Sequence, residues 1–346
     1  MISRFRWLTV LFALAPIACA DTTAPLPPAD EVLLAVNSTE ASLSVIPVEA
    51  PGTGFNIPLG GTTPTPVGVA ARGAVALVPM GLDNSVAVVD LAGGTVTKTI
   101  QLPAGSGATG VAIVSDSIAY VANPNLNTVT RVNYLTGDTA SVAVGVYPQG
   151  IIFTRGKIFV LNGNLVNFAP AGPSWLTVID PVTNTHATGI DSIPLPGPGN
   201  AGFADVGSDG LLYVMSTGDF FGGQGRLSIV DPVGRTEIGN FGGLGTGPGA
   251  LAADAGERLF ISSFSEGLME FNTVTRTVVH GAGDGVPIAG NSAVEVDSKG
   301  RIYAISTGPC QGGTPGVAHV LRSNLSESGS IPLGECAIFA TVTNIP

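Results

Sequence analysis

Charged and aromatic residues are scarce in this sequence. Of its 346 residues, 11% are Asp, Glu, Lys or Arg and 6% are Phe, Trp or Tyr, whereas 45% are hydrophobic. Intrinsic disorder needs low hydrophobicity and high charge, so the composition excludes it. With 14 Lys and Arg against 25 Asp and Glu, the net charge is −11, and the clustered cations that nucleic-acid binding requires are missing. We therefore expect a folded protein with no nucleic-acid partner.

Long hydrophobic runs are absent after residue 20. No stretch there reaches the roughly 18 apolar residues that cross a bilayer without a charge, a proline or a glycine pair. The chain instead carries 48 Gly and 26 Pro, which interrupt regular elements. Many short strands joined by turns are the expected result.

Histidine, the usual general base and metal ligand near neutral pH, occurs three times. His186 and His319 fall in predicted strands, which indicates structural roles, and only His280 borders a predicted loop. So few histidines disfavour a haem or copper centre. No serine-hydrolase elbow and no phosphate-binding loop stands in the sequence either. The sequence therefore favours binding over catalysis.

The N-terminus has the layout of a secretory signal peptide. Arg4 and Arg6 precede an apolar run over residues 8–15, and small residues follow it. We expect residues 1–20 to be this signal and the protein to be exported.

Two cleavage sites remain open. Ile17-Ala18-Cys19 resembles the end of a bacterial lipobox, which would place a lipid on Cys19, and the Pro/Ala/Thr-rich residues 21–31 would then serve as a tether. Membrane contact would come only through this anchor, in the periplasm or at the cell surface. The alternative is cleavage ahead of Asp21 and a freely secreted protein.

An internal repeat organises the rest of the chain. Its middle strands end 41 to 51 residues apart, and β-propeller blades are about 40 to 50 residues long. Seven copies predict seven blades. The middle strands are predicted at 42–47, 85–90, 127–133, 176–180, 227–231, 268–272 and 317–322.

The order of strands predicts how the ring closes. A full unit contains four strands, for example at residues 110–114, 118–122, 129–132 and 139–144. The chain opens at Val32 with a second-type strand and ends at 337–342 with a first-type strand. We therefore predict an all-β domain over residues 32–346, a seven-bladed propeller of four-stranded antiparallel blades. The C-terminal strand completes the first blade, and this 3+1 closure suits a monomer.

Two cysteines remain in the mature chain. Cys310 falls between the second and third strands of blade 7, and Cys336 falls in the link to the closing strand. Both connections emerge on the same face of a propeller, so an exported protein is expected to join them in a disulfide. Two unpaired buried thiols are the alternative.

Ala119-Tyr120-Val121-Ala122-Asn123, with Asn127-Thr128-Val129 and Thr136-Gly137, resembles the YVTN-type (YncE-like) β-propeller repeat of exported bacterial and archaeal proteins. Residues 250–262 and 293–304 are similar to repeats of the streptogramin lyase and gluconolactonase group. The resemblance covers residues 32–342. It implies a rigid disc with binding loops on one face.

Two carboxylates depart from the pattern of the channel-lining strands. Aligning these strands places Asp205 and Glu295 in one column with Ala112 and Ala252. They are candidate ligands for a divalent cation, Ca²⁺ or Mg²⁺, because hard cations prefer oxygen ligands. A metal-dependent lactonase or lyase is therefore the alternative function. The other interpretation is that backbone N–H groups and water satisfy both carboxylates. No other cofactor is expected.

The loops on the cysteine face are the second candidate site, and the longest of them are residues 162–174 and 216–225. Aromatic and amide groups suit a protein or a small polar ligand, although the phenylalanines can also cap their own blades. The leading hypothesis is a non-enzymatic binding module of the cell envelope. The candidate residues are Tyr147, Asn162, Asn164, Phe168, Asp219, Phe220, Phe221 and His280.

Overall fold

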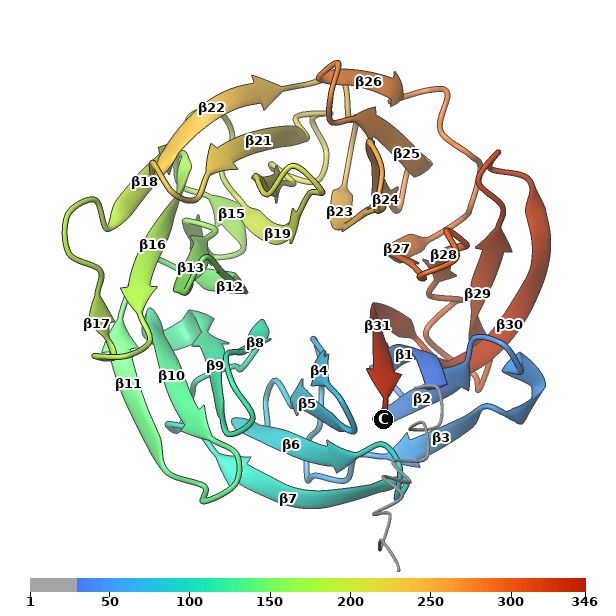
Figure 1. The fold of residues 1–346 in the computed structure, drawn as a ribbon, viewed down its shortest axis with the longest axis horizontal. Coiled ribbons are helices and arrows are strands. Elements are labelled where there is room, and N and C mark those ends of the chain that lie inside the picture. The colour runs from blue at the N-terminus through green and yellow to red at the C-terminus, as the bar shows by residue number, and fades with distance from the viewer. Residues whose placement is uncertain (1–29) are drawn as a thin grey trace, which may run out of the picture.

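The computed structural model describes residues 30–346. The predicted signal peptide, Cys19 and residues 21–29 of the predicted linker lie outside the described residues. Seven four-stranded antiparallel sheets stand around a central axis (Figure 1). The prediction of an all-β, seven-bladed propeller is confirmed.

Strands are counted in each blade from the axis outward. Blades 1 to 3 consist of β31 (Ala337–Ile345), β1 (Asp30–Asn37), β2 (Ser42–Pro47) and β3 (Phe55–Pro58); β4 (Ala70–Arg72), β5 (Val75–Pro79), β6 (Ser85–Asp90) and β7 (Thr95–Gln101); and β8 (Val111–Ile113), β9 (Ile118–Asn123), β10 (Thr128–Asn133) and β11 (Thr139–Ala143). Blade 4 consists of β12 (Pro148–Thr154), β13 (Lys157–Asn162), β16 (Ser174–Asp180) and an outer edge divided between β17 (Thr185–His186) and β18 (Ser192–Leu195).

Blades 5 to 7 repeat the same order. They consist of β19 (Ala201–Val206), β20 (Leu212–Ser216), β21 (Arg226–Asp231) and β22 (Thr236–Phe241); β23 (Pro248–Ala253), β24 (Arg258–Ser263), β25 (Gly267–Asn272) and β26 (Thr277–His280); and β27 (Asn291–Val296), β28 (Ile302–Ser306), β29 (Pro315–Leu321) and β30 (Glu327–Glu335). The connections add the hairpin β14 (Leu165–Val166) and β15 (Ala169–Pro170) and the short 3-10 helices η1 (Pro51–Thr53) and η2 (Pro124–Leu126).

The third strands end where the repeat predicts, except that β29 ends one residue early, at Leu321. Side-chain capping explains most of these ends. The carboxylate of Asp90 accepts hydrogen bonds from the N–H groups of Ala92 and Gly93 in the following turn. Asn133, Asp180, Asp231 and Asn272 cap their turns in the same way. An Asp or Asn at this position favours the turn over a longer strand.

The C-terminal strand closes the ring as predicted. β31 pairs antiparallel with β1 from Asp30–Ile345 to Asn37–Ala337. The predicted Cys310–Cys336 disulfide is confirmed, with the two Cα atoms 4.4 Å apart. It links the upper loop of blade 7 to the residue that precedes β31.

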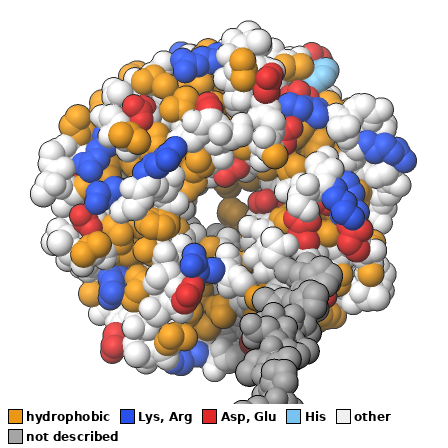
Figure 2. Space-filling view, in the orientation of Figure 1, with side chains coloured by type: hydrophobic (Ala, Val, Ile, Leu, Met, Phe, Trp, Pro, Cys, Tyr) orange, Lys and Arg blue, Asp and Glu red, His pale blue; other side chains and the backbone are white. Residues whose placement is uncertain are grey.

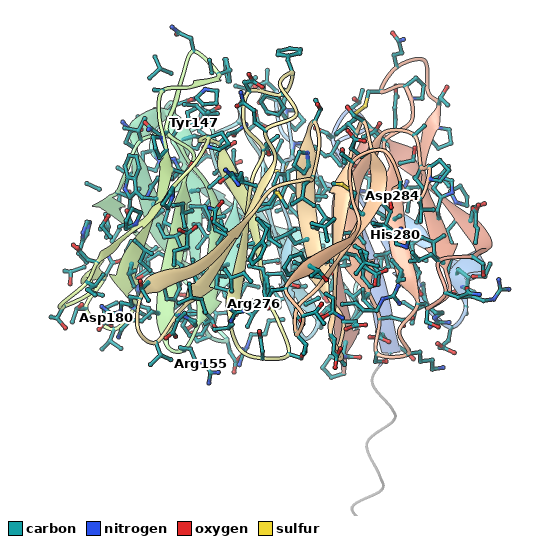
Figure 3. All side chains as sticks on the ribbon, turned by 90° about the horizontal axis from the view of Figure 1, so that it is seen from above. Tyr147, Arg155, Asp180, Arg276, His280 and Asp284 are labelled. Atoms are coloured by element: carbon teal, nitrogen blue, oxygen red, sulfur yellow. A yellow bond between two sulfur atoms is a disulfide. The ribbon has the colours of Figure 1, made fainter. Side chains whose placement is uncertain are left out.

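The disc has two faces. The upper face carries the connections between second and third strands and between blades, and the lower face carries the remaining turns. Figure 2 views the lower face, where Lys and Arg side chains are spread around the ring. Figure 3 shows the disc from the side, with Tyr147 at the upper face and Arg155 and Asp180 at the lower face. Among residues 30–346 no helix is long and apolar enough to cross a membrane.

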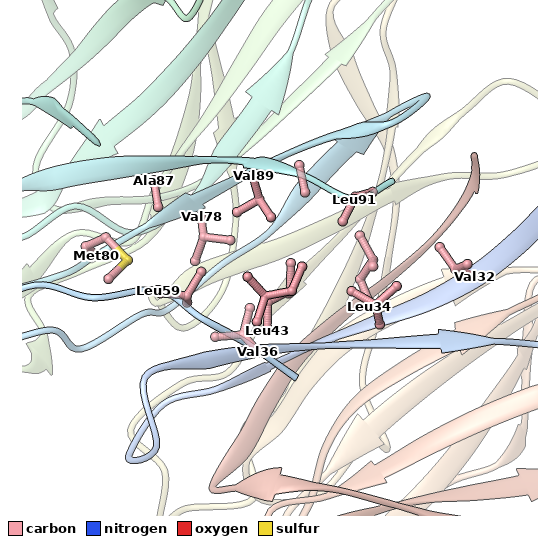
Figure 4. Packing of buried hydrophobic residues seen from close by; sticks show 13 residues of the cluster. Val32, Leu34, Val36, Leu43, Leu59, Val78, Met80, Ala87, Val89 and Leu91 are labelled. Carbon is pink, nitrogen blue, oxygen red and sulfur yellow. The ribbon is translucent and has the colours of Figure 1, made fainter. Parts of the chain in front are cut away.

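The hydrophobic core lies between blades. Each buried cluster joins residues of two neighbouring blades, as Leu34 and Leu43 of blade 1 do with Val78 and Val89 of blade 2 (Figure 4). Both faces of every blade are therefore covered. Strands buried on both faces consist of continuous apolar runs, which explains the high hydrophobic content and the few charges.

Candidate functional site

The first strands of the blades surround a narrow central channel. A pocket of about 330 Å³ lies in it, lined by residues 67–69, 109–111, 149–151, 202–204, Leu161 and Phe339. Phe203 and Phe339 face each other across it with stacked rings, centroids 6.0 Å apart. Glycines let the strands approach closely, because a Cβ on Gly110 would lie 2.4 Å from the carbonyl oxygen of Gln149. Apart from Thr109 and Gln149, the lining residues are glycines and apolar residues, so the pocket is largely apolar.

Asp205 of β19 and Glu295 of β27 are half-buried on these first strands. Both oxygens of Asp205 accept backbone hydrogen bonds at 2.8 Å, one from Val206 and one from Ala253 in the next blade. Glu295 accepts a backbone hydrogen bond from Val342 of β31. Each carboxylate therefore ties its own blade to the next one around the ring. These contacts match the interpretation in which backbone groups satisfy the two carboxylates.

The channel environment raises the pKa of both acids. Burial raises the pKa of Asp205 to about 6. Burial raises the pKa of Glu295 as well, and the negative charge of Asp205 adds to that rise. Acidic side chains border the central opening in Figure 2. Among residues 30–346 no group of three or more His, Cys, Asp or Glu is placed to hold a metal ion. The cation site at this pair stays a prediction.

Aromatic side chains stand exposed on the upper loops. The exposed fraction is 74% for Phe168, 49% for Phe220 and 90% for Phe221. The ring of Tyr147 packs edge-on against Phe168, with centroids 6.1 Å apart. Phe264 in the next upper loop is also exposed, and the sequence analysis missed it. Phe264 lies between a second and a third strand, as Phe220 does, and this equivalent position in the repeat could have identified it.

Local hydrogen bonds fix the two long loops. Asn167 and Phe168 both have positive φ at the turn of the β14–β15 hairpin, as a type I′ turn requires. The side-chain amide of Asn164 closes the base of this loop by donating to the carbonyl of Pro173 at 3.0 Å. In the other loop, Asp219 accepts from the N–H groups of Phe221 and Gly222, and these bonds lower its pKa. Asn164 and Asp219 therefore shape the loops that display the phenylalanines.

The structure places Asn162 inside blade 4, away from the surface. Its side-chain amide donates to the hydroxyl of Thr177 at 2.9 Å and to the carbonyl of Trp175 at 3.0 Å. Equivalent bonds join Asn37 to Ser44 and Asn123 to Thr130. The Asn at the upper end of a second strand is thus a structural part of the repeat, so its assignment to the binding surface is corrected. Ser44 follows Asn37 by seven residues, and Thr130 follows Asn123 by the same number. This recurring spacing in the sequence could have identified the structural role.

His280 lies at the rim of blade 6. It is the last residue of β26, the outer strand of blade 6, and its Nδ1 lies 3.6 Å from a carboxylate oxygen of Asp284. Figure 3 shows both residues on the outer wall of the disc. His280 ends the outer strand where the link to blade 7 begins on the upper face, so its part in the binding surface stays a prediction.

Comparison with known proteins identifies the fold and no more. No family model matches the chain, and no curated protein matches it in sequence. Among the solved structures that match is hydrazine synthase of Kuenenia stuttgartiensis, with a TM-score of 0.64 and 15% identity over 90% of this chain and 100% of that chain. The chain shares the β-propeller fold. At this identity the likeness carries nothing about activity, and the YVTN-type resemblance stays a prediction at the level of family.

Proposed function

We propose that this protein is an exported, lipid-anchored binding module of the cell envelope, which holds a protein or a small polar ligand on its upper face without catalysing a reaction. The exposed phenylalanines carry this proposal. Phe168, Phe220 and Phe221 are held in water by loops with their own hydrogen-bond networks. Rigid aromatic side chains on loops of a fixed scaffold are typical of binding surfaces.

The charge of the upper face disfavours a polyanion as its partner. Its acidic side chains accept hydrogen bonds from loop N–H groups, and Arg226 is its single cation among residues 30–346. Like charges facing each other across an interface oppose association. The carboxylates engaged in this way are those of Glu40, Asp83, Asp219, Glu266 and Asp284.

The start of β1 sets the orientation that a lipid anchor would give the disc. β1 starts at Asp30 on the lower face, so a lipid on Cys19 would hold that face toward the membrane. The upper face would then point away from the bilayer toward its partner.

The test compares binding of labelled protein to isolated cell envelopes. We expect Phe168→Ala and Phe221→Ala to weaken binding about tenfold or more, because aromatic anchors dominate interfaces. Their Tm should stay unchanged, since neither side chain is buried. Val233→Ala is the matched control, because Val233 is 73% exposed on a lower turn. Equal binding by all variants would overturn the proposal.

A further inference from the structure

A second pocket opens on the upper face, at the outer part of blade 5. Its volume is about 540 Å³, which falls in the range of small-molecule sites. Three connections supply its walls: the link before β19 at Pro198, the loop before β21 at residues 223–225, and the link after β22 at Gly242 and Gly243. Gln224 and Arg226 are its only lining residues with polar side chains.

Arg226 stands without a partner in this pocket. It is the first residue of β21, opposite Ser216 at the upper end of the blade. It forms no ion pair with any carboxylate of residues 30–346, although Asp and Glu outnumber Lys and Arg in the chain. Asp219 of the same loop binds backbone N–H groups instead. The guanidinium therefore keeps its donors for water or a ligand.

Two glycines leave room around the guanidinium. A Cβ on Gly197 would lie 3.3 Å from Nε of Arg226, and a Cβ on Gly242 would lie 3.4 Å from Nη1. Larger residues at either position would press on the side chain and cover its donors. An arginine left uncovered in this way presents a planar fork that matches the two oxygens of a carboxylate.

We propose that this pocket, the Arg226 pocket, binds the carboxylate of the ligand that the upper face holds. Phe220 and Phe221 precede the pocket residues in the same loop and would contact the rest of the ligand. A peptide C-terminus and an acidic sugar both offer this group. The inference rests on the proposed function and specifies the chemical group that the ligand carries.

The test is calorimetric titration of the exported protein with two matched pairs of probes. An N-acetylated dipeptide with a free carboxylate is compared with its amide, and glucuronate is compared with glucose. We expect one acid to bind at least tenfold more tightly than its neutral partner, which also identifies the source of the carboxylate. Arg226→Gln should remove that preference. Arg155→Gln, which changes an arginine on a lower turn, should keep it.

A second variant tests the role of the open space. Gly242→Val retains Arg226 but crowds its guanidinium, so it should also lose the preference for the acid. Equal binding of acid and neutral probes, persistence of the preference in Arg226→Gln, or no acid binding up to about 10 mM would each overturn the inference. If Arg226→Gln binds envelopes normally while Phe221→Ala does not, the inference fails and the proposed function stands. If the acid preference holds but the phenylalanine variants bind envelopes normally, the proposed function fails.

Discussion

At the scale of single residues, Asp205 has an electrostatic effect that depends on pH. Its pKa in the folded protein is about 6, above its ordinary value of 3.8. As pH rises through this window, the unfolded chain releases the proton before the folded chain does, so the free energy of unfolding falls. Above pH 6 the loss is complete and amounts to about 3 kcal/mol at most.

The effect of Asp205→Asn on stability should therefore reverse its sign between pH 8 and pH 4. At pH 8 the variant should have a Tm a few degrees above the original protein, because it removes the buried charge. At pH 4 Asp205 is protonated, so the variant removes no charge, and it should be less stable because its amide nitrogen cannot accept the second backbone hydrogen bond. Thermal unfolding at both pH values measures this. Asp116→Asn is the control, because its carboxylate is 89% exposed in a surface ion pair with Arg72 and its loss should change the Tm only slightly at either pH. A Tm difference independent of pH would contradict the assigned pKa.

Asn162 gives a second prediction at the residue scale. Asn162→Ala leaves the Trp175 carbonyl and the amide N–H of Gly145 without their buried partner. Removing one partner of a buried hydrogen bond lowers stability by about 1–3 kcal/mol. Urea unfolding should show this loss, while the folded variant binds envelopes normally. Asn125→Ala, at an exposed position of an upper loop, should be neutral. Loss of binding without loss of stability would restore Asn162 to the binding surface.

At the scale of elements, the closing strand β31 depends on two constraints, its pairing with β1 and the Cys310–Cys336 disulfide. The disulfide joins residues separated by 26 positions. Cross-links over loops of this length contribute roughly 3 kcal/mol, mainly by restricting the unfolded chain.

The double variant Cys310→Ser/Cys336→Ser should lose about 2–4 kcal/mol of stability in urea unfolding. It should keep the propeller, because the pairing of β31 with β1 remains. A reductant should destabilise the original protein by a similar amount and leave the double variant unaffected. An equal response of both proteins to reductant would show that the disulfide does not hold the closure.

At the scale of the whole molecule, metal binding separates the two functional hypotheses. A cation at about a hundred times its dissociation constant adds roughly 2.7 kcal/mol to stability. We expect the Tm to stay unchanged with Ca²⁺ or Mg²⁺, since both oxygens of Asp205 already accept backbone hydrogen bonds. A chelator-treated sample is the control. A rise that Asp205→Asn abolishes would favour the lactonase or lyase alternative.

The sequence by itself determined the number of blades, the strand that closes the ring and the pairing of Cys310 with Cys336. These properties follow from local signals. Apolar runs make strands, Asp or Asn at a strand end makes the turn, and the spacing of the copies counts the blades. β2 and β6 accordingly span the residues that the repeat indicated.

Only the tertiary structure decided which side chains of different blades meet. The stacking of Phe203 on Phe339, the bond from Ala253 to Asp205 and the glycines around Arg226 all join segments far apart in the chain. Such contacts depend on the angle between blades and on the direction of each side chain, and neither leaves a local pattern in the sequence. The same reason explains why Asn162 is buried and His280 stands at the rim.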